Sequence, residues 1–486
     1  MSFSLDAYQA WRQGQEPDWL LREGQKEGGA RQPKERLLQY IWQHQSLHRK
    51  SLQTLDGRQC QVLHPGFWNH GPGPDFTQGM IRLDGKEEIE GDIEIDCDCS
   101  GWRAHGHDRN QAFAGVILQV VWAPPNRAPS GRLVLPLEDA IQGSIEELSA
   151  LFADQSPQLP EEFSGRCCAP FYGAPLETVR SLLRTAALQR FRNKASLLSA
   201  RAREVGWRRS LWEAMVGGLG YSRNTWPMRC VGELTPVLFP EFPDQPLLAY
   251  SATEVEARLF GIAGFLPKDP NDIHSPYLNQ MWDVWWRIRD EFSEVALPKN
   301  VWRISGMRPH NHPHRRLALV AQWLQRADFF HSLEWWITTA TRGNSMEMLK
   351  NALSVIAPPF WSSRFNFSRV SLGVSPHLIG EARMIDLAIN SILPWCWARA
   401  QAGSNQAMMD RSEALFLAMP RSEENRLLKN ARVRLMGRCD PKLLGTAADQ
   451  QGVLQVLRDF CAHSNALCDD CRLPELVRTV SGRKTV

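Results

Sequence analysis

The sequence predicts an α+β protein in which a mixed sheet flanked by helices is followed by a larger, mostly α-helical region. Short apolar runs separated by turn residues occupy residues 52–135, whereas helical periodicity dominates beyond Pro175. The chain of 486 residues is also longer than one hydrophobic core usually supports. We therefore expect a polar extension (1–32), a sheet-containing domain (33–155), a linker (156–174), a helical domain (175–430) and a helical tail (431–486).

An amphipathic helix is expected where the folded chain begins. Residues 1–32 are polar and rich in Gly, Gln and Arg, and "GQKEGGARQP" resembles a linker. The following "KERLLQYIWQHQ" places Leu37, Leu38, Ile41 and Trp42 on one helical face. Pro33 can open this helix at its first turn, because a proline there loses no helical hydrogen bond.

Residues 52–135 are expected to form strands. Asp56-Gly57 and Asp84-Gly85 are turn signals beside short apolar runs such as "GMIRL" and "VILQVVW". The second run is almost continuously apolar, which is typical of a strand covered on both faces. A helix followed by several strands and a buried central strand predicts one compact α/β or α+β unit.

Helical periodicity characterises the rest of the chain. In "LETVRSLLRTAALQRFRNKASLLSARAREVG", Val179, Leu182 and Ala186 recur at helical spacing, and the pattern continues in segments such as "EARMIDLAINSILPW". Most of the 19 tryptophans fall in this half. We expect them in the core rather than on a surface that stacks nucleic-acid bases.

The stretch "GDIEIDC" bears most directly on function. In a strand, Asp92, Glu94 and Asp96 would share one face while Ile93 and Ile95 point towards a core. One interpretation is a solvated edge strand whose charges discourage aggregation. The other is a cation site, since carboxylates on one face can act together as ligands.

Flanking residues favour the cation site. Pro74-Asp75 precedes a predicted strand, and a hairpin between that strand and the acidic one would bring Asp75 near Glu94. Downstream, "WRAHGHDRNQAF" adds His105 and His107. Carboxylates and imidazoles together suit a divalent cation, although the two histidines could instead hydrogen-bond the backbone of a loop.

The order of these residues resembles that of the PD-(D/E)XK nuclease superfamily, in which Pro-Asp on one strand is followed by Glu-x-Lys on the next. Here Pro74-Asp75 precedes Glu94-Ile95-Asp96, and Glu35 lies on the preceding helix, where that superfamily often has an extra acid. The resemblance implies a restriction-endonuclease-like core at residues 33–155. Asp96 departs from the pattern because it stands where the superfamily has lysine.

The same resemblance implies a divalent-metal-dependent nuclease that hydrolyses phosphodiester bonds, in DNA rather than RNA. Its metal, Mg²⁺ or Mn²⁺, would polarise the phosphodiester and lower the pKa of an attacking water. His105 or His107 would replace the lysine, either as a base or as a nitrogen ligand that shifts the preference towards Mn²⁺ or Zn²⁺. The metal ligands would be Asp75, Glu94, Asp96, His105 and His107, and the catalytic residues Asp75, Glu94, Asp96, His107 and Glu35.

Two other functions stay open on the sequence. The absence of the lysine would suit a catalytically inactive nucleic-acid-binding or scaffolding protein on the same fold. The histidines and carboxylates would also suit a Zn- or Fe-dependent hydrolase of another substrate class.

The chain as a whole resembles an uncharacterised bacterial family known only as a domain of unknown function. This resemblance implies one coherent protein over nearly all of the chain, but no activity. It rests on "LQYIWQHQ", "HPGFWNHGPGPDF", "GDIEID", "HGHDRNQAF" with "VILQVVW", "EARLFGIAGFL", "WRISGMRPHNHPHRRLA", "AINSILPW" and the cysteine-bearing tail.

The C-terminal "FCAHSNALCDDC" is a second candidate metal site. Cys461, Cys468 and Cys471 are spaced C-x6-C-x2-C, and clustered thiolates hold zinc or iron. The fourth ligand would be Cys439 or the more distant Cys168. The grouping resembles that of iron-sulfur exonucleases of the PD-(D/E)XK superfamily, which implies a [4Fe-4S] cluster; Zn²⁺ and unligated thiols are the alternatives.

The segment "GMRPHNHPHRR" combines histidines at alternate positions with arginines. An extended segment would aim His310, His312 and His314 the same way, but the interspersed prolines favour a rigid loop that caps a helix beginning near Arg315. The arginines of this segment, and those between residues 180 and 209, either contact nucleic-acid phosphates or form a solvated face.

Composition excludes several classes of protein. Contents of 43% hydrophobic and 22% charged residues indicate a globular chain, and a net charge of +3 does not by itself indicate a nucleic-acid partner. The sequence has neither a signal peptide nor a run of ~18 apolar residues, so we expect a cytoplasmic protein with no membrane partner. It also has no P-loop, G-x-S-x-G or H-E-x-x-H motif.

Overall fold

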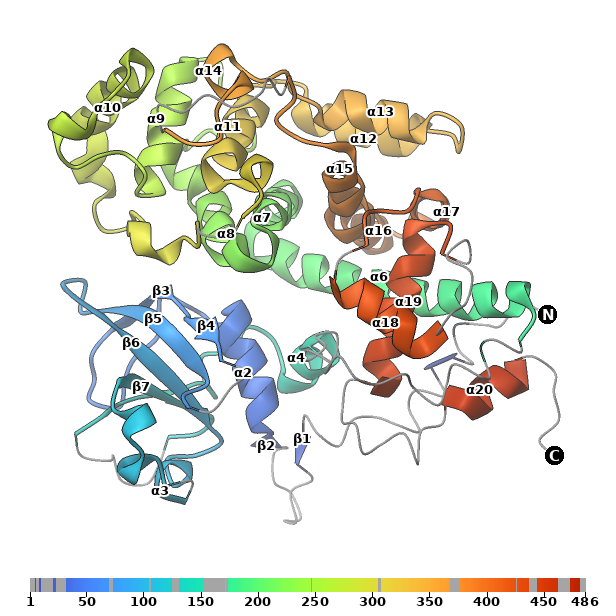
Figure 1. The fold of residues 1–486 in the computed structure, drawn as a ribbon, viewed down its shortest axis with the longest axis horizontal. Coiled ribbons are helices and arrows are strands. Elements are labelled where there is room, and N and C mark those ends of the chain that lie inside the picture. The colour runs from blue at the N-terminus through green and yellow to red at the C-terminus, as the bar shows by residue number, and fades with distance from the viewer. Residues whose placement is uncertain are drawn as a thin grey trace. The chain divides into compact units, whose positions relative to one another are not determined.

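The chain is an α+β protein with a curled mixed sheet in its N-terminal part and a mostly helical remainder (Figure 1). It divides into two compact units, residues 10–157, here called the sheet unit, and residues 1–9 with 158–486, here called the helical unit. The predicted linker at 156–174 lies almost wholly outside the described residues. This computed structural model describes residues 5, 8–9, 21–22, 32–69, 73–104, 106–124, 131–152, 171, 174–245, 247–304, 307–367, 376–424, 426–436, 444–461 and 473–480.

The sheet unit is built around a mixed sheet of six strands among its described residues. The strand order is β3-β5-β6-β7-β8, and β4 pairs with β5. The pairs β3–β5 and β5–β6 are antiparallel, whereas the pairs β6–β7 and β7–β8 are parallel. The strands are β3 (Cys60–His64), β4 (Phe67–Trp68), β5 (Phe76–Leu83), β6 (Glu87–Asp96), β7 (Val116–Val121) and β8 (Leu133–Pro136), with a separate pair β1 (Leu21–Arg22) and β2 (Gln32–Pro33).

Helix α2 (Glu35–His44) contributes to the core of the sheet unit together with α4 (Ile145–Phe152) (Figure 1). The predicted apolar face is confirmed, because Leu37, Leu38 and Ile41 are fully buried in one cluster with residues of the strands. The prediction that Pro33 opens the helix is wrong. The helix begins at Glu35, and Pro33 belongs to β2, where it pairs with Leu21.

Strand β6 lies in the middle of the sheet, with β5 on one side and β7 on the other. The predicted hairpin between β5 and β6 is confirmed, and it turns at residues 84–86. Strand β7 is buried along Leu118–Val121, as its apolar sequence predicts. The interpretation of the acidic stretch as a solvated edge strand is therefore wrong, because both edges of β6 are hydrogen-bonded to other strands.

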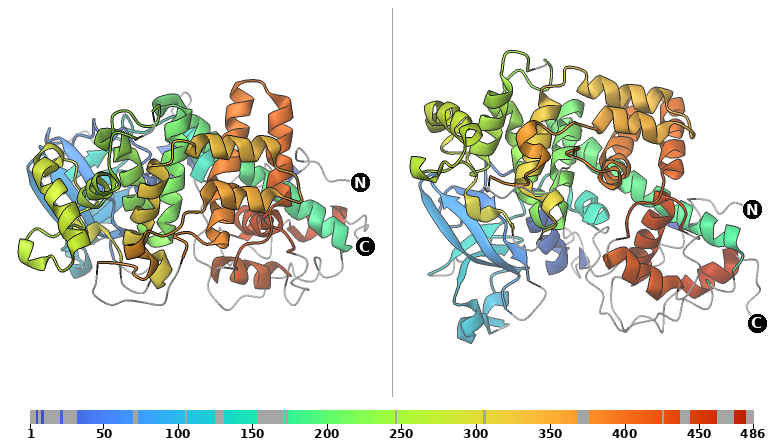
Figure 2. Two further views of the ribbon diagram at one scale, coloured as in Figure 1. Left: turned by 90° about the horizontal axis from the view of Figure 1, so that it is seen from above. Right: turned by 45° about the horizontal axis from the view of Figure 1, so that its top comes forward.

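Long helix α6 organises the helical unit, and α7, α16 and α19 pack against it (Figure 2). The expectation that tryptophans belong to the core is confirmed for Trp212, Trp323, Trp336 and Trp395, which are almost fully buried. None of the described helices is both long and apolar enough to cross a membrane. The helices are α6 (Leu176–Val205), α7 (Trp207–Leu219), α8 (Tyr221–Leu238), α9 (Ala252–Ile262), α10 (Pro276–Ile288), α11 (Pro313–Leu324), α12 (Phe329–Thr339), α13 (Ser345–Leu353), α14 (Pro359–Ser362), α15 (Glu381–Leu387), the π-helical η7 (Ala388–Ile392), α16 (Leu393–Ala402), α17 (Gln406–Ala418), α18 (Arg426–Met436), α19 (Ala447–Cys461) and α20 (Leu473–Val480).

The histidine-rich segment forms a capped turn, as its prolines predict. A 3-10 turn at Pro309–Asn311 leads into α11, and the His312 side chain accepts a hydrogen bond from the backbone N–H of His314. The helix begins at Pro313, slightly earlier than the prediction near Arg315. The rings of His312 and His314 are buried, and His314 packs on Phe265 with ring centroids 4.1 Å apart.

Several arginines that were candidates for phosphate contact instead hold the helical unit together. Arg315 and Arg316 are almost completely buried and donate to backbone carbonyl groups, Arg315 to His377 at 2.7 Å and Arg316 to Leu378 at 2.8 Å. The phosphate-contact interpretation is wrong for these two residues, because their guanidinium groups face the interior.

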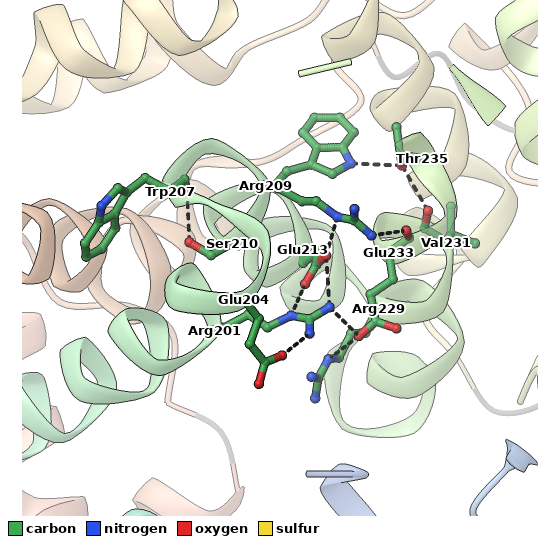
Figure 3. Close-up of polar contacts among 11 residues, drawn as sticks. Arg201, Glu204, Trp207, Arg209, Ser210, Glu213, Arg229, Val231, Glu233 and Thr235 are labelled. Carbon is green, nitrogen blue, oxygen red and sulfur yellow. Dashed lines mark hydrogen bonds and ion pairs between the residues drawn. The ribbon is translucent and has the colours of Figure 1, made fainter. Parts of the chain in front are cut away.

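Arg201 and Arg209 belong to an ionic network between α6, α7 and α8 (Figure 3). The buried Glu213 carboxylate accepts from Arg201 Nε at 2.7 Å and from Arg209 Nε at 3.0 Å. Arg229 pairs with Glu233 at 3.0 Å in the same network. This cluster joins three consecutive helices by charge-assisted hydrogen bonds.

Substituting Glu213→Gln is expected to destabilise the helical unit by about 3 kcal/mol, because it leaves partly buried guanidinium groups without their counter-charge. Glu204→Gln is the matched control, since Glu204 pairs with the same Arg201 but its side chain is 36% exposed. The control should cost less than about 1 kcal/mol. Urea unfolding followed by circular dichroism measures both, and equal losses would contradict the assignment.

Mild acid is expected to destabilise the helical unit through its buried histidines. Burial lowers the pKa of His312 to about 4 and that of His314 well below its ordinary value of 6.5. Stability is therefore fully present above pH 6.5 and is lost as the pH falls towards 4, because the unfolded state takes up the protons.

The variant His312→Asn retains a capping oxygen at the start of α11 but cannot titrate. It should recover about 2 kcal/mol of the stability lost by pH 5, measured as the free energy of unfolding at pH 7 and pH 5. The exposed His331→Asn serves as control and should leave the pH dependence unchanged. Identical acid sensitivity in both variants would contradict the role given to His312.

Candidate metal centre

The candidate site is built on the middle of the sheet, where Glu94 and Asp96 lie two residues apart on β6. Side chains two apart in a strand point to the same face. Glu94 is 6% exposed and Asp96 1% exposed, and β6 pairs with β7 at both positions. Burying carboxylates costs free energy unless hydrogen bonds or a cation compensate.

Asp75 is joined to β6 through two hydrogen bonds, each between a backbone N–H group and a carboxylate. The register of β5 and β6 pairs Phe76 with Ile93, which sets Asp75 beside Glu94. The backbone N–H of Asp75 donates to Glu94 Oε2 at 3.0 Å, and that of Ile95 donates to Asp75 Oδ2 at 3.1 Å. The structure thus brings together the two carboxylates that the hairpin was expected to place side by side.

Helix α2 adds Glu35 to the site through Gln39. The two residues are one helical turn apart, and Gln39 Nε2 donates to Glu35 Oε1 at 3.0 Å and to Asp75 Oδ1 at 2.8 Å. Gln39 is itself 5% exposed. Because one amide group donates to both carboxylates, Glu35 lies close enough to raise the pKa of Asp75 by its charge.

Strand β7 supports Asp96 through Gln119, the one polar residue in "VILQVVW". Gln119 Nε2 donates to Asp96 Oδ2 at 2.8 Å, and both side chains are 1% exposed. On the other side, Gly101 approaches so closely that a Cβ atom there would lie 2.4 Å from Asp96 Oδ1. Backbone and amide group together fix the orientation of this carboxylate.

His107 completes a group of three potential ligands. Its Nδ1 lies 3.4 Å from Glu94 Oε1, and one ligand atom each of Glu94, Asp96 and His107 lie within 4.8 Å of one another. The imidazole stacks on Phe113, with ring centroids 3.9 Å apart and an angle of 9° between the rings, and it meets the edge of Trp102. The aromatic rings hold His107 facing the carboxylates.

Burial and the repulsion between neighbouring carboxylates raise the pKa values of two acids in this site. Burial and the charge of Glu35 raise the pKa of Asp75 to about 7. Burial and the charge of Asp75 raise the pKa of Glu94 to about 9. Such shifts are typical of carboxylates gathered where no cation offsets their charge.

The remaining predicted site residues lie outside the described residues. His105 is not among the described residues. The same holds for Cys168, Cys439, Cys468 and Cys471 and for the side chain of Cys461, so the cysteine site with iron-sulfur or zinc stays a prediction.

Gln39 and Gln119 are site residues that the sequence analysis did not identify. Each had a signal: Gln39 lies four residues after Glu35, on the same helical face, and Gln119 interrupts an otherwise apolar strand. A buried amide in such a run needs a hydrogen-bond partner. Its partner here is one of the predicted ligands.

Fold and site define an α+β protein whose sheet unit carries a largely buried cluster of carboxylates and one imidazole. A family model described as "Protein of unknown function (DUF2851)" matches residues 35–426, so the chain belongs to that family. The resemblance to an uncharacterised family is thereby confirmed. Neither the curated proteins nor the solved structures gave a match.

Metal-free protein is expected to lose stability as the pH rises from about 4.5 towards 9, because the Glu94 carboxyl group keeps its proton in the folded state but releases it in the unfolded state. Glu94→Gln removes this proton equilibrium and should raise the free energy of unfolding at pH 9 by about 2 kcal/mol or more. Unfolding of EDTA-treated protein at pH 5 and pH 9 measures the difference.

The control for this experiment is Glu90→Gln, which neutralises an exposed carboxylate on the same strand. It should follow the pH dependence of the unsubstituted protein. If Glu94→Gln does so as well, the Glu94 carboxyl group is ionised in the folded protein and the electrostatic description of the site is wrong.

Proposed function

We propose that the sheet unit is the catalytic part of a divalent-metal-dependent nuclease that hydrolyses phosphodiester bonds in DNA. The observation that carries the proposal is the convergence of Glu35, Asp75, Glu94, Asp96 and His107 from separate elements on one largely buried site. Two of these carboxyl groups have strongly raised pKa values. A bound divalent cation would offset the repulsion that raises them.

The arrangement of elements supports a restriction-endonuclease-like core. Helix α2 carries Glu35, Asp75 immediately precedes β5, and β6 carries Glu94 and pairs with the parallel strand β7. Short helical turns at 101–113 connect β6 to β7. The PD-(D/E)XK superfamily places its acids in the same order on a helix and two adjacent strands.

The donor set fits a hard divalent cation. Carboxylate oxygens of Asp75, Glu94 and Asp96 suit Mg²⁺ or Mn²⁺, and the imidazole of His107 favours Mn²⁺ over Mg²⁺. Such an ion, when bound, supplies a Lewis acid for the phosphodiester and acidifies a water molecule. Gln39 and Gln119 orient the carboxylates by donating to Asp75 and Asp96.

The lysine of the superfamily is absent, and we assign its roles to two other residues: proton transfer to His107 and charge stabilisation to Arg132. His107 adjoins Glu94 and, as the alternative to binding the cation, can take up a proton from an attacking water. Arg132 lies over the Trp102 ring at 4.1 Å, and its buried Nη1 has no hydrogen-bond partner among the described residues. Burial lowers its pKa, while the nearby charges of Cys99 and Asp96 act in the opposite direction. We assign to Arg132 the stabilisation of charge on the phosphate.

Two alternatives rest on specific features of the same site. Asp96 in the place of the lysine favours a non-catalytic relative that binds nucleic acid or acts as a scaffold. His107 among the ligands favours a hydrolase that uses zinc or iron on another substrate. The two alternatives differ from the proposal in what the purified protein cleaves.

With Mn²⁺, the purified protein is expected to cleave plasmid or single-stranded DNA. Asp75→Asn and Glu94→Gln should each lower the rate about a thousand-fold or more, since each removes a metal ligand that contributes several kcal/mol. The exposed Glu90→Gln is the control and should retain the full rate. Gel electrophoresis of the products at equal protein concentrations measures the three variants.

The alternatives give different results in this experiment. Salt-sensitive DNA binding without cleavage would identify the non-catalytic relative. Zinc or iron in freshly purified protein, without DNA cleavage under any metal, would identify the second hydrolase class. Cleavage that survives in Asp75→Asn would assign the activity to another site or to a contaminant, and the proposal would fail.

A further inference from the structure

A cavity of about 520 Å³ lies in the helical unit and is unrelated to the residues of the proposed nuclease. It is formed by the turn between α12 and α13, by α17 and by single residues of α6 and of the segment before α19. Its size is that of a site for a small molecule. The lining residues are Arg184, Ala340, Thr341, Arg342, Arg411, Ala414, Leu415, Leu417, Ala418 and Thr446.

Three arginines, Arg184, Arg342 and Arg411, line this cavity and have little counter-charge among the described residues. Arg342 is exposed and makes no ion pair or hydrogen bond among the described residues. Arg184 is 48% exposed, and its carboxylate partner among the described residues, Asp449, is 4.0 Å away. Three positive groups around one small cavity make it a place of positive potential.

Arg411 is fixed in position by the end of α12. Its Nε donates to the Ile337 carbonyl oxygen at 2.5 Å, and its Nη2 donates to that of Ala340 at 2.6 Å. The last carbonyl groups of a helix lack partners within the helix, and Arg411 supplies donors at this helix end. Its Nη1 makes no recorded hydrogen bond among the described residues, and the guanidinium is held rigid before any ligand arrives.

Most of the remaining wall of the cavity is apolar. Ala414, Leu415, Leu417 and Ala418 line it from α17, and Ala340 lines it from the end of α12. Apolar walls with a few convergent polar groups are typical of sites for organic ligands. A simple inorganic anion would use the arginines but would leave the apolar wall unoccupied.

We propose that this cavity binds a small organic anion, in which a phosphate ester or carboxylate group meets Arg184, Arg342 and Arg411 and a compact apolar body lies against α17. Guanidinium groups bind both kinds of oxyanion through paired hydrogen bonds. The site is separate from the carboxylates of the sheet unit, so it would hold a ligand whether or not the protein cleaves DNA.

Ligand-observed NMR titration of the full chain tests the proposal with four probes. Phenyl phosphate and benzoate carry both an anionic group and an apolar ring, inorganic phosphate carries only the charge, and benzyl alcohol carries only the ring. We expect the first two to bind at least about ten-fold more tightly than the last two, and the tighter of them identifies the preferred anionic group. Binding should weaken as the salt concentration rises.

The variant Arg342→Ala should weaken binding of the preferred probe by about ten-fold or more, the effect of one charge-assisted hydrogen bond. Arg342 makes no hydrogen bond or ion pair among the described residues, so the fold should be unaffected, as circular dichroism can verify. The control Arg287→Ala removes an exposed arginine from α10 and should leave binding unchanged. Equal binding by all four probes, or by both variants, would overturn the proposal.

A single-stranded oligonucleotide provides the last comparison. If it displaces phenyl phosphate and binds far more tightly in an Arg342-dependent manner, the arginines contact a nucleic-acid strand. That result would also overturn the assignment of a small organic anion.

Discussion

The burial of carboxylates on a central strand is the constraint on which the sheet unit depends. Glu94 and Asp96 lie in the interior, where an unpaired charge costs several kcal/mol. Backbone N–H groups and the amide groups of Gln39 and Gln119 compensate part of this cost. The raised pKa values of Asp75 and Glu94 show that part of this cost remains uncompensated. The site therefore favours binding of protons or of a cation.

The placement of the acids was predictable from local patterns, whereas their surroundings were not. Alternation in "GDIEID" and the Asp84-Gly85 turn were sufficient to pair Asp75 with Glu94. The position of β6 in the middle of the sheet depends on its pairing with β7. These strands are connected by short helical turns, and no local sequence pattern indicates that they pair with each other. Gln119 could be noticed as a polar interruption, but its partner depends on the parallel register of two strands.

Arginine in the helical unit shows how composition can mislead. The arginine-rich segments suggested either phosphate contacts or a solvated face, yet Arg315 and Arg316 donate inward to carbonyl groups, and Arg201 and Arg209 surround a buried glutamate. The planar guanidinium group with its five donors suits such interior positions better than lysine does. Only burial and partners, which the sequence does not contain, distinguish a structural arginine from one that meets a ligand.

The two hydrogen bonds between Asp75 and the acidic strand link the site to hairpin alignment. In one bond the Glu94 side chain accepts from the Asp75 backbone, and in the other the Asp75 side chain accepts from the Ile95 backbone. Both bonds can form in only one register of β5 against β6. A slip of one residue would turn Glu94 to the opposite face and bring isoleucine into its place. If β5 and β6 pair in the wrong register, Asp75 and Glu94 cannot lie side by side. An intact site therefore indicates that the hairpin has folded in the correct register.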